Sequence, residues 1–319
     1  MGIIQKIRRH AAVAGGDFGA MFKGAQVPPL PLAVNRLLTE LNKDNPDSDL
    51  LVRLISSEAA IAAKVLQTVN SAFFGLKSPV TDISRAVALL GLKNIRNLAL
   101  AFGTMAALPK PEGNLFDHEA FWNDSLLRAH LARSFGQIML PGQGDEAFTA
   151  ALLADVAIPV LLSVWSEYYA PVVNEWLNSS KRLSQIERDH FGWDHAQAGA
   201  WMVRSWRFPD EIVCYIGAHT LSMADIQTYE LEGTLAVPIA IAAQGASVLR
   251  SDDARMATLH CWATDRLDLP DPVFVDHINA IRNSFDEIIA LFGLSNRGSD
   301  ALLAQLLAVV ESGSGKAAS

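Results

Sequence analysis

Apolar residues recur along most of this chain with the spacing of an α-helix. Between residues 30 and 41 the apolar stripe consists of Leu30, Ala33, Val34, Leu37, Leu38 and Leu41, and similar stripes continue as far as Leu291. Apolar residues at positions i, i+3, i+4 and i+7 lie on one face of a helix, which is the face that packs. Alternation of polar and apolar residues, the pattern of a strand, lasts for no more than a few residues anywhere. The pattern therefore predicts an all-α protein.

Prolines, glycines and capping residues divide this pattern into separate helices. The helices predicted in this way are 30–41, 50–55 (capped by Asp47 or Ser48), one from Ser56 or Ser57 to near Gly75, 83–90 (capped by Thr81 or Asp82), 93–107, 118–139, 146–169, 184–190, 195–206, 209–219, 235–250, 253–266 and 272–293. The clearest boundaries between them are the loop 109–117, which holds prolines and a glycine, and the segment 221–234. No repeat of fixed period is present.

Composition and charge limit what this helical chain can do. Half of its 319 residues are hydrophobic and 19% are charged, which is enough apolar material for a sizeable core. The formal net charge of −8 repels phosphate backbones, so we expect no nucleic-acid partner. The two cysteines, Cys214 and Cys261, make no disulfide framework and are typical of buried thiols in a reducing compartment.

Neither a membrane span nor a secretory signal is predicted. The longest apolar stretch, 147–165, is interrupted by polar residues and a proline, among them Asp155 and Pro159. Residues 1–25 contain basic residues but no continuous apolar core of a signal peptide. We interpret them as a lead-in that docks loosely on the domain, with a short membrane-surface helix as the alternative. The predicted location is the cytoplasm.

Searches for common catalytic motifs find none that stands on its own. The chain has no glycine-rich phosphate loop, no H-E-x-x-H, no G-x-S-x-G and no C-x-x-C. Glu187 and His190 have the spacing of a di-iron ligand pair, but a second such pair is missing. Trp193, Trp201 and Trp206 fall close together and are typical of core residues rather than of an aromatic cage.

The segment 70–103 stands out by its content of small and polar residues around two helices and a tight turn. One interpretation is a helix-turn-helix with Arg85, Lys93 and Arg96 facing phosphates. Three positive charges are few for that task, and the apolar residues from Leu89 to Ile95 leave little polar face. A packed helical corner is the interpretation that we favour.

The same segment carries a resemblance to a known family. NSAFFGLKSPVTDISRAVALLGLKNIRNL, preceded by VPPLPLAVNRLLTELN and followed by matching stretches at 121–135, 146–162 and 187–220, resembles the HDOD family, a bacterial branch of the HD-domain fold. The motif positions are Asn70, Ser71, Gly75, Pro79, Gly91, Arg96 and Asn97. The resemblance implies an HD-domain-like multi-helix bundle over 26–220. A helical extension over 221–312 and a flexible tail over 313–319 would follow it.

The resemblance also implies where a catalytic relative would hold metal ions. Such enzymes use a first His, a His-Asp pair, later His residues and a late Asp. The corresponding positions in this chain are Asp124, Ala154, Asp155, His195, His219 and Gln244. Ala154 has no lone pair to donate, and Gln244 has no charge. Asp155, His195 and His219 survive, and two His with one carboxylate can in principle form a facial triad.

These departures predict a non-catalytic signalling or regulatory module on a degenerate HD fold. We expect no catalytic residues, no bound metal and no cofactor. The expected partners are a protein of a signalling pathway and a small ligand in the vestigial pocket, while the oligomeric state stays open. The alternative is a metal-dependent phosphohydrolase with a reduced ligand set, and a DNA-binding regulator ranks third.

Overall fold

The computed structural model describes residues 18, 28–71, 76, 78–250 and 252–312, and throughout these residues the regular secondary structure is helical. The helices are α3 (Leu32–Leu41), α4 (Ser48–Ser57), α5 (Ala59–Val69), α6 (Ile83–Leu90), α7 (Leu92–Ala107), α8 (His118–Met139), α9 (Gly144–Leu152), α10 (Ala157–Val164), α11 (Ser166–Leu177), α12 (Leu183–Phe191), α13 (His195–Ser205), α14 (Asp210–Ala218), α15 (Met223–Thr228), α16 (Ala236–Ala242), α17 (Asp253–Leu267), α18 (Asp271–Leu291) and α19 (Ser299–Glu311). An isolated bridge between Ser247 and Arg250 is the one strand-like pairing in this part of the chain. The all-α prediction is confirmed.

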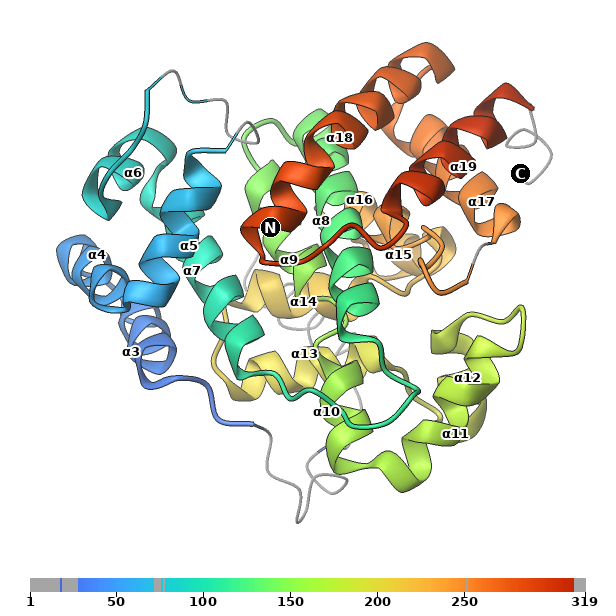
Figure 1. Cartoon of the computed structure of the whole chain (residues 1–319), viewed down its shortest axis with the longest axis horizontal. Helices are drawn as coiled ribbons and strands as arrows, with labels where there is room; N and C mark the ends of the chain where they lie inside the picture. The colour runs from blue at the N-terminus through green and yellow to red at the C-terminus, as the bar shows by residue number, and fades with distance from the viewer. Residues whose placement is uncertain (1–17, 19–27, 72–75, 77, 251, 313–319) are drawn as a thin grey trace.

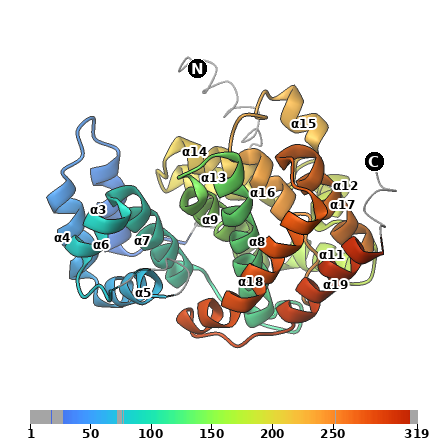
Figure 2. The ribbon, with the colours of Figure 1, turned by 90° about the horizontal axis from the view of Figure 1, so that it is seen from above.

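Helix α8 forms the centre of the molecule. In Figure 1 it runs between the N-terminal helices α3–α7 on one side and the C-terminal helices α17–α19 on the other, and Figure 2 shows the same order from above. It packs against α9, α16 and α18, and residues on all its faces are buried, including Trp122, Leu126 and His130. A helix enclosed in this way can present residues to a closed interior. The predicted bounds of 118–139 are confirmed.

The hydrophobic core is continuous across the end of α14. One cluster of buried residues joins Leu126 of α8 and Ile216 of α14 with Ile239 of α16 and Leu306 of α19. The C-terminal segment is also held by polar contacts, because Asn123 of α8 donates to the Ser295 carbonyl at 3.0 Å and accepts from the Arg297 amide at 3.0 Å. Residues beyond 221 therefore complete the same packed interior.

The predicted long helix 146–169 is wrong, and the break in it includes Asp155, one of the candidate site residues. The chain forms α9, then turns at Leu153–Val156, and restarts as α10 and α11. Pro159 explains the break, since a proline ring clashes with the carbonyl four residues earlier, here that of Asp155. The break releases Asp155 from a regular helical position.

Other predicted bounds differ for local reasons. The helix predicted over 235–250 is wrong beyond α16, because the Val248 amide donates to the Asp124 carboxylate at 2.8 Å and holds the chain in a turn. Helix α15 lies inside the segment predicted as a loop, started by a capping box of Ser222 and Asp225. Helix α19 was not predicted as a separate element. Helix α5 ends at Val69 rather than near Gly75, and it begins after Glu58 without a serine cap.

The stretch Gly144–Val164 is the one candidate membrane span in the described part of the chain, by length and composition. An 18-residue window within it has a mean hydropathy of 2.1, and 78% of this window is buried inside the protein. This burial and the break at Leu153–Val156 are the properties of core helices.

Candidate functional site: a histidine–aspartate cluster in an arginine-lined cavity

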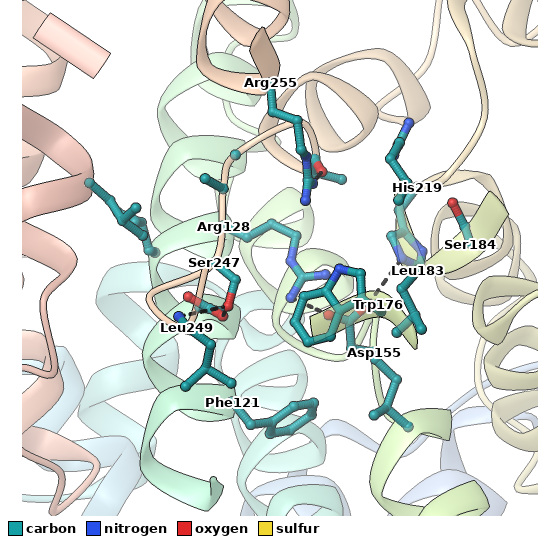
Figure 3. Close-up of a pocket in the computed structure, with 18 of the residues that line it drawn as sticks. Phe121, Arg128, Asp155, Trp176, Leu183, Ser184, His219, Ser247, Leu249 and Arg255 are labelled. Atoms are coloured by element: carbon teal, nitrogen blue, oxygen red, sulfur yellow. Dashed lines mark hydrogen bonds and ion pairs between the residues drawn. The ribbon is translucent and has the colours of Figure 1, made fainter. Parts of the chain in front are cut away.

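Asp155, His195 and His219 meet at one point beside α8. Their side chains offer three donor atoms that lie within 4.8 Å of one another. Asp155 Oδ1 is 3.3 Å from His195 Nε2 and 3.1 Å from His219 Nε2, and the two Nε2 atoms are 3.2 Å apart. The three residues that survive from the family's ligand set therefore form a compact triangle (Figure 3 labels Asp155 and His219).

Three helix ends bring these side chains together. Asp155 lies in the turn between α9 and α10, His195 is the first residue of α13, and His219 follows the last residue of α14. The start of α13 is fixed by a capping box, in which the Asp194 side chain accepts from the Gln197 amide and Gln197 accepts from the Asp194 amide. Helix ends hold a side chain in place while leaving it outside the regular helical packing.

Each histidine is oriented by a hydrogen bond on the far side of its ring. His195 Nδ1 lies 2.6 Å from Glu187 Oε2, which also accepts from the His195 amide at 2.9 Å. His219 Nδ1 donates to the Ile216 carbonyl at 2.6 Å. The Tyr169 hydroxyl donates to the other oxygen of Glu187. Both rings consequently turn Nε2 toward Asp155, an orientation that is common among metal-binding histidines.

The charge of this cluster is balanced by Arg128. Its guanidinium lies 2.6 Å from Asp155 Oδ2, and the two side chains are only 10% and 16% exposed. Burial alone would raise the pKa of Asp155, but Arg128 and the two histidines hold it well below its ordinary value. Although burial opposes protonation of His195, Glu187 and Asp155 raise its pKa to about 10. Burial lowers the pKa of His219.

The triangle fits a metal ion in spacing. Two donors about 2.1 Å from one ion are roughly 3.0 Å apart at a right angle and about 3.4 Å apart at the tetrahedral angle. The observed separations of 3.1–3.3 Å fall between these values. In addition, Asp155 Oδ1 is buried without a hydrogen bond of good geometry in the described structure.

The cluster does not fit a metal ion in charge or in number of ligands. Arg128 already neutralises Asp155, the one carboxylate among the three donors. Metal binding would also have to displace a proton from His195, against its raised pKa. The remaining family positions add no donor, as their placement shows.

Asp124 lies on the cavity wall, but its two oxygens are occupied. Oδ2 accepts from the Ser247 hydroxyl at 2.5 Å and Oδ1 from the Val248 amide at 2.8 Å. Burial raises the pKa of Asp124 to about 6, although these hydrogen bonds lower it. Asp124 thus fastens the C-terminal segment to α8 and does not take the place of the missing first His.

Ala154 and Gln244 stand apart from the cluster. Ala154 is fully buried, and its carbonyl faces Gly199 of α13. Gln244 follows α16, its side-chain amide donates to the Ala240 carbonyl of that helix at 3.2 Å, and it is not among the residues that line the cavity.

Sequence reasoning missed the arginines of the cavity. The cavity is partly open to solvent and has a volume of about 150 Å³, and Arg128, Arg182 and Arg255 line it together with the cluster. They come from α8, from the residue before α12 and from α17, positions far apart in the sequence. Arg182 lies shortly before the stretch 187–220 that carries the resemblance. Nothing in the sequence indicates that it lies near Arg255.

The family-motif residues lie elsewhere. Asn70 follows α5 and clamps Val80, donating to its carbonyl at 2.7 Å and accepting from its amide at 2.6 Å. Gly91 joins α6 to α7 with a positive φ of 83°. The described motif positions Asn70, Ser71, Pro79, Gly91, Arg96 and Asn97 are absent from the cavity lining. Gly75 lies outside the described residues.

Comparisons with known proteins agree with this architecture. The family model of the HDOD domain matches residues 27–221. An uncharacterized protein of Treponema pallidum (strain Nichols) is 26% identical over 203 residues, which are 61% of this chain and 37% of that protein. The chain therefore spans little more than a third of the length of this relative.

Solved structures share the fold. A protein named "Putative signal transduction protein" from Marinobacter aquaeolei VT8 matches with a TM-score of 0.62 and 21% identity, over 93% of this chain and 66% of that one. One named "Putative phosphohydrolase" from Shewanella amazonensis SB2B matches with a TM-score of 0.58 and 23% identity, over 92% and 95%. An HDOD domain protein with unknown function from Geobacter sulfurreducens gives a TM-score of 0.59 at 19% identity, over 96% and 98%. On the match over 27–221, this chain belongs to the HDOD domain family.

Proposed function

We propose that this protein is a non-catalytic regulatory module of bacterial signal transduction, which binds a small ligand in the arginine-lined cavity and passes the signal to a protein partner. The buried ion pair between Arg128 and Asp155 carries this proposal. It supplies from within the chain the positive charge that a catalytic relative obtains from metal ions. A cluster neutralised in this way has no need of a dication and offers none to polarise a phosphoester.

Three further features support the proposal. Ala154 has no side-chain lone pair to donate, and the oxygens of Asp124 accept from Ser247 and Val248. The side chain of Gln244 donates to the Ala240 carbonyl of α16. Loss of even one residue that supports a metal ligand costs about 10–100-fold in affinity or activity. The combined losses leave a cavity shaped for binding rather than for hydrolysis.

The rival function is that of a metal-dependent phosphohydrolase, which the spacing of the donor triangle favours. In that case Asp155, His195 and His219 would hold the ion, which would activate water and polarise the phosphoryl group. A hydrolysis assay separates the two functions. The full chain is incubated with bis(p-nitrophenyl) phosphate and Mn²⁺, Fe²⁺ or Zn²⁺, beside a variant in which Asp155 is changed to Ala.

We expect both proteins to give the same background rate with every metal. A rate above background that depends on a metal and disappears in the Asp155→Ala variant would contradict the proposal. The regulatory part is tested by capture of partners from the native host, with the Asp155→Ala variant as matched bait. A partner retained by the native protein and lost with the variant would support it.

A further inference from the structure

Three guanidinium groups converge on the cavity from different parts of the fold. Arg128 comes from α8, Arg182 from the residue before α12 and Arg255 from α17. Figure 3 shows Arg128 and Arg255 entering the same space, which Trp176, Leu183 and His219 border. Three cations that line one largely buried cavity are stabilised by carboxylates or by an anionic ligand.

Three carboxylates, those of Asp117, Asp124 and Asp155, also line the cavity, but only Asp155 forms an ion pair with one of these arginines. Arg128 pairs with Asp155 at 2.6 Å, and its Nε is still buried without a hydrogen-bond partner in the described structure. Arg182 and Arg255 form no ion pair within 4.0 Å among the described residues. Burial, together with Arg182 and the other nearby arginines, lowers the pKa of Arg255 to about 10, although Asp252 opposes the shift.

The hydrogen bonds of Arg255 are directed at the backbone. It donates to the Gln244 carbonyl at 3.1 Å and to the Ala243 carbonyl at 2.9 Å, which holds it at the cavity wall without neutralising it. The side chain of Arg182 forms no hydrogen bond or ion pair with the described residues, and it lines the cavity. Two arginines without a paired carboxylate match the charge of a dianion such as a phosphate monoester.

The size and lining of the cavity limit the rest of the ligand. The cavity has a volume of about 150 Å³, similar to that of a protein cavity which holds one benzene molecule, but it is partly open to solvent. Apolar side chains such as Leu131, Leu183 and Trp176 cover part of the wall, while Ser184 and Thr220 add hydroxyls. A phosphoryl group that carries one small organic group matches a cavity of this size and lining.

We propose that the cavity binds a small phosphate monoester as a dianion, held by Arg128, Arg182 and Arg255 without a metal ion. This inference rests on the proposed regulatory function and names the class of ligand for it. The guanidinium N–H groups that the protein leaves unused bind the phosphoryl oxygens, and the apolar wall packs against the organic group. Phosphate release or transfer forms no part of the proposal.

The test is calorimetric titration of the full chain after treatment with a chelator. The probes are phenyl phosphate, inorganic phosphate, benzoate and benzenesulfonate at constant ionic strength. We expect saturable one-site binding that is tightest for phenyl phosphate, because it combines the double charge with a ring of suitable size. Benzenesulfonate has a similar shape with a single charge and is expected to bind about tenfold more weakly or worse.

The variant Arg182→Gln tests the arginine whose substitution breaks no ion pair of the folded protein. We expect it to weaken phenyl phosphate binding by about tenfold or more with an unchanged melting temperature. Lys181→Gln is the matched control, since it removes the same charge one residue away, where Lys181 pairs with Asp189 at 2.9 Å outside the cavity lining. The control is expected to bind like the native protein.

Each outcome bears on one proposal or on both. Absence of saturable binding, equal affinity for phenyl phosphate and benzenesulfonate, or no effect of Arg182→Gln would overturn the phosphate-monoester inference. If the protein also lacks metal-dependent hydrolysis, the proposed regulatory function stands. Binding that appears only after Mn²⁺ or Zn²⁺ is added and is lost in Asp155→Ala would overturn both proposals.

Discussion

The carboxylate of Asp155 divides its two oxygens between different partners. Oδ2 pairs with Arg128, and Oδ1 faces the Nε2 atoms of His195 and His219. A buried carboxylate needs a positive partner, because an isolated buried charge is too costly to keep ionised. Arg128 and a metal ion are therefore alternative ways to stabilise the same carboxylate.

Removal of Arg128 is expected to create a demand for metal. Arg128→Gln leaves a buried carboxylate without its partner, at a cost of about 3–5 kcal/mol in the free energy of unfolding. Zn²⁺ or Co²⁺ is expected to restore part of this loss, seen as a larger rise in melting temperature for the variant than for the native protein. The control is Arg133→Gln, which removes an arginine of the same helix that pairs with Asp145 at 2.7 Å. An equal rise in melting temperature with metal in the native protein and in both variants would contradict the view that a metal ion can take the place of Arg128.

The raised pKa of His195 predicts how stability changes with pH. The charged groups that face His195 are Asp155, Glu187 and Asp194, with His219 beside it. Its pKa rises on folding from 6.5 to about 10, so its contribution is complete below pH 6.5 and is lost as the pH rises toward 10. Glu187→Gln removes the largest contribution that raises this pKa. We expect the variant to lose about 2–4 kcal/mol less of its free energy of unfolding over the same pH range. Denaturant unfolding of both proteins between pH 6 and pH 10 measures it, and parallel curves would contradict the assignment.

At the scale of helices, Gly91 shows what a local signal can predict. The chain turns there between α6 and α7 with φ 83° and ψ 148°, a conformation that residues with a Cβ rarely adopt. A Cβ at this position would meet no atom within 4 Å, so the cost of substitution comes from the backbone alone. The glycine and its neighbours in sequence were sufficient to place this turn.

Substitutions at Gly91 are expected to lower stability by about 1–3 kcal/mol. Because the site is open, Gly91→Ala and Gly91→Val are expected to cost similar amounts in the free energy of unfolding. Gly233→Ala is the control, since its φ lies outside the positive range and its Cβ would also meet no atom within 4 Å. If Gly91→Ala melts like the native protein, or if Val costs far more than Ala, the backbone explanation fails.

The break between α9 and α10 had a local signal in the sequence, a proline, but the prediction gave more weight to the apolar pattern. Pro159 stood within the predicted helix 146–169, yet the strong apolar run around it suggested continuity. The steric effect of Pro159 on the Asp155 carbonyl breaks the helix. In contrast, the end of α16 depends on Asp124, which is more than a hundred residues away in the sequence. No local pattern predicts this helix end.

At the scale of the whole molecule, the cavity depends on segments that the family match does not include. The match to the HDOD family ends at residue 221, whereas the cavity is also lined by Ser247, Arg255 and Leu306 of α19. The resemblance pointed to Asp155, His195 and His219, and the structure brings these three residues together. The arginines could not be predicted, because their charges meet only when α17 packs beside α8.

A chain that ends at residue 221 is expected to lose its cooperative fold. Truncation exposes the faces of α8 that α16, α17 and α18 cover, and it removes the partners of Asp124. We expect broad thermal melting of the truncated chain by circular dichroism and binding of a hydrophobic dye, while the full chain melts sharply. Sharp melting of the truncated chain would show that the HDOD segment forms its core alone.

The central claim is that Arg128 replaces a metal ion at the Asp155–His195–His219 cluster. Elemental analysis tests it most directly, on native protein prepared without chelator and on a variant with all three residues changed to Ala. Arg128 neutralises the single carboxylate, so we predict far less than one equivalent of Fe, Mn, Ni or Zn in the native protein, with no difference between the two. One equivalent of metal in the native protein and none in the variant would contradict the claim.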